Sequence, residues 1–220
     1  MIFLERFRVS AAENSQNNGL LLPYGSKSDY ACSMGIVEHA YEMARVALQD
    51  LPLRWTHVQG VAKRANHALS LFSFEDGQFL ISAALLHDVG YSKSLARTGF
   101  HPLDGAYYMH ESGISGRLCA LVAHHSCAYL EAELRGFSVE LGQWEDEQTP
   151  LRDALWWADM TTSPDGELTS LQERISEIQQ RYGPEDLVTT FIRNANGELE
   201  AAVNRTEERL RSIRRIHDAK

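Results

Sequence analysis

The spacing of apolar positions along the chain predicts helices. In most of the sequence, apolar residues recur every three to four positions, which places them on one face of a helix. Runs of β-branched residues are short, and no set of alternating strands emerges. We therefore predict an all-α fold, with one helix beginning after His101 and the others over residues 29–51, 53–72, 79–88, 114–130, 151–159, 168–182 and 184–216.

Polar and turn-forming residues divide the chain into three parts. Residues 1–28 contain the segment ENSQNNG and are predicted to form an N-terminal arm. Residues 29–165 are predicted to form one helical bundle domain. Residues 166–220 are charge-rich and amphipathic, so we expect a C-terminal extension of flanking helices that packs on the same domain and could support a homodimer.

Three local signals are expected to interrupt this helical pattern. Asp76-Gly77 indicates a turn before the helix over residues 79–88, and Gly197 could interrupt the last helix. The polar segment over residues 131–150 reads as a connector.

Composition narrows the classes of function. The chain has 220 residues, of which 44% are hydrophobic and 23% charged, as in an ordinary globular protein. No apolar run is long enough to span a membrane, and the start of the chain lacks the features of a secretory signal, so we expect a cytoplasmic protein that does not bind membranes. A formal net charge of −9 argues against binding of extended nucleic acid, but it leaves a small phosphorylated substrate open.

The cysteines do not indicate a disulfide framework or a thiolate metal site. Cys32, Cys119 and Cys127 are odd in number and have no C-x-x-C spacing. We expect free, buried thiols.

One adjacent polar pair stands out at the end of an apolar run. The segment AALLHDVGY, residues 83–91, brings His87 and Asp88 to the end of a helix that is apolar on most of its circumference. Burial of imidazole and carboxylate is costly unless they are hydrogen-bonded or bind a metal. The dipeptide alone is weak evidence, since His217-Asp218 occurs in the charged C-terminal tail.

Further histidines and aspartates lie in apolar helical contexts elsewhere in the chain. A set spread over five predicted helices can converge only in the core of a bundle, where facing helices build metal sites. Imidazole and carboxylate ligands without thiolate suit divalent Fe, Mn, Zn, Co or Ni. The candidate metal ligands are His57, His87, Asp88, His101, His124, His125 and Asp159.

Together these segments resemble the HD superfamily of metal-dependent phosphohydrolases. The resemblance covers roughly residues 53–162 and depends on the joint order of the elements, because each alone would be weak. The segments that carry it are RWTHVQGVA with His57, LLHDVGY with His87 and Asp88, FHPLDGA with His101, VAHHS with His124 and His125, and WWADM with Asp159.

The resemblance implies one or two metal ions per chain and assigns roles to the candidate residues. His87 and Asp88 would be the catalytic pair, and Asp88 would bridge the two ions. Lys93 and Arg97, in the following loop, are candidate substrate contacts. The first ion would be held by His57, His87, Asp88 and Asp159, and the second by Asp88, His101 and either His124 or His125.

Three departures from the family's patterns limit the substrate. No Gly-Tyr-Pro follows the double histidine, which argues against hydrolysis of cyclic dinucleotides. No acidic pair follows Asp88, so the mechanism of the alarmone hydrolases is unsupported. Many members have Lys directly after the glycine of the HD segment, whereas this chain has Tyr91.

The expected function is hydrolysis of a phosphoester bond in a small, nucleotide-like substrate by metal-activated water. One alternative is a mixed-valence di-iron oxygenase of the HD type that acts on a small organic substrate, with Tyr24 as a candidate gate. A further alternative is a non-catalytic metal-binding module that binds a partner. Substrate identity, metal identity and oligomeric state stay open at this level.

Overall fold

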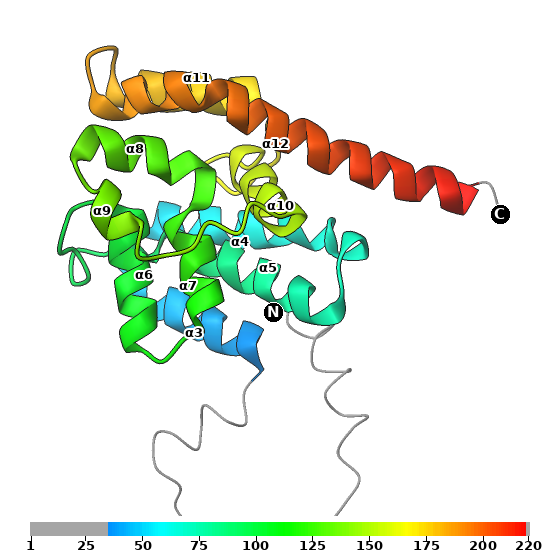
Figure 1. Cartoon of the computed structure of the whole chain (residues 1–220), viewed down its shortest axis with the longest axis horizontal. Coiled ribbons are helices and arrows are strands. Elements are labelled where there is room, and N and C mark those ends of the chain that lie inside the picture. Colours follow the sequence, from blue (N-terminus) through cyan, green and yellow to red (C-terminus); the bar gives the residue numbers. More distant parts are fainter. Residues whose placement is uncertain (1–34, 219–220) are drawn as a thin grey trace, which may run out of the picture.

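The computed structural model of the protein describes residues 35–218, and it is built of helices throughout that range (Figure 1). The described residues contain no β-strand, only an isolated antiparallel bridge between Thr162 and Leu168. The predicted all-α fold is therefore confirmed. The helices are α3 (Ile36–Ala47), α4 (Pro52–Asn66), α5 (Phe74–Leu86), α6 (His101–Glu111), α7 (Gly116–Ala123), α8 (Ala128–Arg135), α9 (Ser138–Leu141), α10 (Pro150–Met160), α11 (Leu171–Tyr182) and α12 (Leu187–Asp218), with short 3-10 turns at Leu69–Leu71, Val89–Tyr91 and His125–Cys127.

Helices α5 and α10 form the centre of the bundle. Helix α5 packs against α3, α4, α7 and α10, and its residues from Leu80 to Leu86 are all buried. Every residue of α10 from Leu151 to Met160 is buried, including Trp156 and Trp157. A helix that is covered on all sides is held rigidly by packing, so side chains carried by these two helices have well-defined positions.

The C-terminal helices belong to the same hydrophobic core. Helix α11 packs against α12, and α12 crosses α8 and α10, so that the pair covers one side of the bundle (Figure 1). Apolar side chains of both helices, such as Ile175 and Ile192, are buried in one cluster with Trp156. Arg205 and Arg209 of α12 also bind the buried carboxylate of Asp153 in α10.

Two expected interruptions are absent from the structure. Helix α5 begins at Phe74, because the Ser73 side chain accepts a hydrogen bond from the Asp76 backbone N–H and caps the helix. The turn predicted at Asp76-Gly77 is therefore wrong, since both residues lie in the first turns of α5. Helix α12 also continues through Gly197 without a break.

Two predicted helices are instead divided. The helix predicted over residues 53–72 ends at Asn66, and the chain continues as a short 3-10 turn. The helix predicted over residues 114–130 is broken at Ser126 and Cys127, which have positive φ values of 48° and 61°. The connector predicted over residues 131–150 contains the end of α8 and the short helix α9.

Some sequence-based expectations fall outside this description. The predicted arm over residues 1–28, with Tyr24, and also Cys32 lie outside the described residues. Cys119 and Cys127 are free and buried, as expected. The boundaries between the three predicted parts of the chain stay a prediction. Within residues 35–218, no helix is both long enough and apolar enough to cross a membrane.

Candidate metal centre

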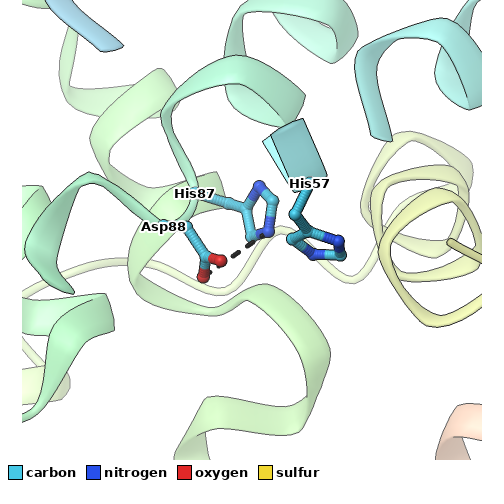
Figure 2. A group of neighbouring side chains, drawn as sticks. All are labelled: His57, His87 and Asp88. Carbon is cyan, nitrogen blue, oxygen red and sulfur yellow. Dashed lines mark ion pairs between the residues drawn. The ribbon is translucent and has the colours of Figure 1, made fainter. Parts of the chain in front are cut away.

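Helix ends bring the predicted ligands from distant parts of the chain into one place. His87 is the residue at which α5 ends, Asp88 follows it, and His101 is the first residue of α6. His57 projects from α4 and Asp159 from α10, and each is buried. The side chains of His57, His87 and Asp88 converge from α4 and the end of α5 (Figure 2).

One group of three side chains could hold a metal ion at this convergence. Ligand atoms of His57, His87 and Asp88 all lie within 4.8 Å of one another. Asp159 adjoins the group, because its Oδ1 lies 3.0 Å from His57 Nε2 and 3.7 Å from His87 Nε2. The four residues that sequence reasoning assigned to the first ion are therefore neighbours in the structure.

A second group shares Asp88 with the first. Ligand atoms of Asp88, His101 and His125 also lie within 4.8 Å of one another. His101 Nε2 is 3.1 Å from His125 Nε2 and 3.6 Å from Asp88 Oδ1. Asp88 alone belongs to both groups.

The backbone fixes which nitrogen of three histidines faces the cluster. The Nδ1 atoms of His57, His87 and His125 lie 3.0, 2.9 and 2.6 Å from the carbonyl oxygens of Ser163, Ala84 and Val122. A carbonyl can only accept, so each Nδ1 must carry the proton and donate it. In the neutral ring the lone pair is then on Nε2, the nitrogen that points into the cluster.

This arrangement leaves lone pairs facing one another, which fits a cation. His57 Nε2 and Asp159 Oδ1 are both acceptors when the imidazole is neutral, yet they are 3.0 Å apart. The buried His87 Nε2 has no hydrogen-bond partner. A divalent ion with nitrogen and oxygen ligands would satisfy these atoms, whereas an empty buried set of this kind is costly. The residues present therefore fit a divalent metal ion.

The break after α7 separates the two neighbouring histidines. His124 Nε2 donates to the carbonyl oxygen of Trp144 at 2.8 Å, and the His124 carbonyl accepts from the Trp156 indole at 3.0 Å. His125, one residue later, turns into the second group. The sequence left open which of the two would be a ligand, and the structure places His125 in the cluster and His124 outside it. Neither group of potential ligands contains His124, so its role as a metal ligand stays a prediction without support from this arrangement.

Ser126 was missed by sequence reasoning. Its hydroxyl donates to Asp159 Oδ2 at 2.5 Å, so it holds the carboxylate whose other oxygen faces His57. The left-handed backbone at Ser126, with φ 48°, is what carries this hydroxyl toward α10. No sequence signal marks this position, because serine is common in ordinary turns.

Arg54 was also missed, although a signal for it existed. It lies three residues before His57 in α4, which places both side chains on the same face of that helix. Its guanidinium donates to Asp88 Oδ2 at 2.8 Å and lies 3.8 Å from the centre of the Tyr91 ring. Tyr91 in turn stacks on His101, with ring centres 4.0 Å apart. Arg54 thus orients the carboxylate of Asp88 and, through Tyr91, the ring of His101.

The electrostatics keep the carboxylates charged and the second histidine pair neutral. Burial alone would raise the pKa of Asp88, but Arg54 and the surrounding histidines outweigh it and hold that pKa well below its usual range. The pKa of Asp159 is likewise lowered despite burial, chiefly by the hydrogen bond that His57 donates when, without a metal ion, its ring is protonated on both nitrogens. Burial lowers the pKa of His101 and of His125. Neutral imidazoles beside charged carboxylates are the forms that bind metal.

Gly90 allows α6 to approach this centre closely. A Cβ atom at Gly90 would lie 2.0 Å from the carbonyl oxygen of His101 and 2.6 Å from the backbone nitrogen of Gly105. The two backbones can therefore be this near only with glycine at position 90. This contact sets the distance between Asp88 and His101.

A cavity of about 280 Å³ adjoins the cluster, lined among others by Asp88, His101, His125 and Asp159. Lys93 and Arg97 do not line it. Lys93 is exposed, and Arg97, also exposed, donates to Glu111 at 2.6 Å. Their role as substrate contacts stays a prediction without support from this arrangement.

The fold and the centre define a class of helical proteins in which histidines and aspartates from several helices meet around a divalent metal site. Comparison with protein-family models places the chain in one such family, since the HD domain model matches residues 54–163, half of the chain. The chain therefore belongs to the HD-domain family, a superfamily of metal-dependent hydrolases. Searches among curated proteins and among solved structures returned no match.

Proposed function

We propose that the protein hydrolyses a phosphoester bond in a small, nucleotide-like substrate, with a water molecule activated at a binuclear metal centre. The observation that carries the proposal is that Asp88 belongs to two groups of potential ligands at once. Asp88 Oδ1 lies 3.6 Å from both His87 Nε2 and His101 Nε2, and a carboxylate oxygen has more than one lone pair, so it could serve two ions, which one imidazole nitrogen cannot. Bound divalent ions would activate water and stabilise the charge that develops on phosphoryl oxygens.

The protein's own residues would hold and orient this centre. We assign the first ion to His57, His87, Asp88 and Asp159. The second we assign to Asp88, His101 and His125. In this proposal, the catalytic role of His87 and Asp88 is to hold the two ions in place. The backbone carbonyls that fix the Nδ1 protons leave the Nε2 lone pairs of these histidines free to bind the ions, which would supply the activated water.

Arg54 and Ser126 would support the carboxylates. Arg54 occupies one oxygen of Asp88, and Ser126 occupies one oxygen of Asp159. Each carboxylate is thereby held in one orientation, which lowers the cost of reorganisation when charge develops in the site. Because Arg54 lines the cavity, its guanidinium is also a candidate donor for a phosphoryl oxygen of the substrate.

The test combines metal analysis with turnover. Protein purified without chelators is analysed for Fe, Mn, Zn, Co and Ni, and is then incubated with a panel of phosphomonoesters and phosphodiesters. We expect two ions per chain and phosphate release that Asp88→Asn abolishes. Two bound ions with no release across the panel would contradict the hydrolase proposal. An iron pair with a mixed-valence EPR signal would instead favour the oxygenase alternative.

A further inference from the structure

Two arginines reach the cavity from outside the part of the chain that the family model matches. Arg174 and Arg181 lie in α11, seven residues and so about two turns apart, which puts them on one face of that helix. Both line the cavity beside the metal centre. Both also line a second hollow of about 310 Å³, together with Arg54 and His57. The two arginines therefore stand where the two hollows adjoin.

Arg174 has an unsatisfied donor in this wall. The residue is only 4% exposed, and its Nη1 donates to Glu177. Its Nε is buried and has no hydrogen-bond partner. A buried guanidinium N–H without an acceptor is costly, so the hydrogen-bond donors of Arg174 are only partly satisfied by the described residues.

Arg174 and Arg181 share one acidic partner on α11. Arg181 Nε lies 3.4 Å from Glu177, the same carboxylate that accepts from Arg174. Glu173, the other acidic residue of α11, is occupied in the capping box at the start of the helix. Two guanidinium groups thus share the Glu177 carboxylate, which cannot occupy all of their N–H donors.

We propose that Arg174 and Arg181 form an anion subsite that binds a second phosphoryl group of the substrate, while the scissile phosphoester lies at the metal centre. The inference rests on the proposed function and narrows its substrate to small molecules with two phosphoryl groups. A planar carboxylate is matched by the fork of one guanidinium. Donors from two separate guanidiniums suit the diverging oxygens of a phosphoryl group.

Binding measurements test the subsite without turnover. Metal ions are removed from the full-length protein with EDTA and dialysis, and titration calorimetry then compares inorganic pyrophosphate with inorganic phosphate. Arg181→Gln removes one charge at a side chain that is 36% exposed, so the variant should fold. Arg45→Gln is the matched control, because Arg45 forms a similar exposed pair with Glu42 in α3. Arg174→Lys keeps the charge but lacks the Nε donor.

We expect the wild type and Arg45→Gln to bind pyrophosphate more tightly than phosphate, and Arg181→Gln to bind pyrophosphate about tenfold more weakly or worse. Arg174→Lys should weaken binding as well, provided that its circular dichroism melt shows a folded protein. Equal pyrophosphate affinity in Arg181→Gln and Arg45→Gln would overturn the subsite. Because this readout needs neither metal nor hydrolysis, it stays decisive even when no phosphoester is cleaved.

Discussion

Asp88 should be the one residue whose replacement removes both metal ions. Asp88→Asn keeps the shape of the side chain and the hydrogen bond from Arg54, but it removes the charge that the two ligand groups share. His101→Ala removes a ligand from the second group only. We therefore expect two ions per chain in the wild type, one in His101→Ala and close to none in Asp88→Asn.

The expected stabilisation follows from mass action. At a free metal concentration of 100 times the dissociation constant, each occupied site adds about 2.7 kcal/mol to the free energy of unfolding. Addition of metal should then stabilise the wild type by about 5 kcal/mol and His101→Ala by about 3 kcal/mol, with almost no effect on Asp88→Asn. Without metal, Asp88→Asn should also cost about 1.5 kcal/mol, because the Arg54 side chain, 20% exposed, loses its charged partner.

Urea denaturation over a series of metal concentrations, with elemental analysis of the same samples, measures both quantities. Asp153→Asn is the matched control, since Asp153 is another buried carboxylate with arginine partners but lies outside both ligand groups. It should be destabilised yet keep the metal dependence of the wild type. If His101→Ala loses both ions, or Asp88→Asn retains one, the bridging role of Asp88 is refuted.

Three more outcomes are expected. In elemental analysis, His125→Ala should lose one ion per chain, whereas His124→Ala should keep both. In urea denaturation, His124→Ala should lose about 1 kcal/mol or more of stability, because its hydrogen bond to Trp144 is removed. Gly90→Ala should cost about 3 kcal/mol in the same denaturation assay and reduce occupancy of the second site, whereas Gly116→Ala, where a Cβ meets open space, should not. Burial lowers the pKa of His101 well below 6.5, so below that pH the unfolded chain binds a proton at His101 that the native chain does not bind. The free energy of unfolding of the metal-free protein should therefore fall as the pH falls from about 6.5. A free energy of unfolding that stays constant down to about pH 5 would contradict this.

The periodic spacing of apolar residues predicted the helices, because it shows which face of each segment is buried. Burial of that face also stabilises the helices of this chain. It failed where a local cap or a backbone break decided the outcome. Ser73 starts α5 five residues before the expected position, although Asp76-Gly77 has the composition of a turn. Positive φ values at Ser126 and Cys127 end a pattern that looks continuous in the sequence. Neither serine nor cysteine is a residue type that commonly adopts a left-handed backbone, so the sequence gives no sign of this break.

The same break explains why the choice between His124 and His125 could not be made from the sequence. In one continuous helix the two side chains would differ in direction by roughly 100°, and either could face the core. The structure ends α7 at Ala123, so that His124 meets Trp144 and His125 meets His101. Tertiary placement of the loop before α10, which carries Trp144, decides between them, and no local pattern encodes it.

Arg174 shows how the C-terminal helices could have been interpreted more closely. Charge-rich amphipathic segments are expected to present their charges to solvent. Yet Arg174 falls in the stripe of α11 whose other members, Leu171, Ile175 and Ile178, are buried, and it is buried with them. A cation at an apolar-stripe position must either find a buried partner or face a cavity that holds an anion. Glu177 supplies part of that partnership, and because Arg174 also lines the cavity beside the metal centre, an anion bound there would supply the rest.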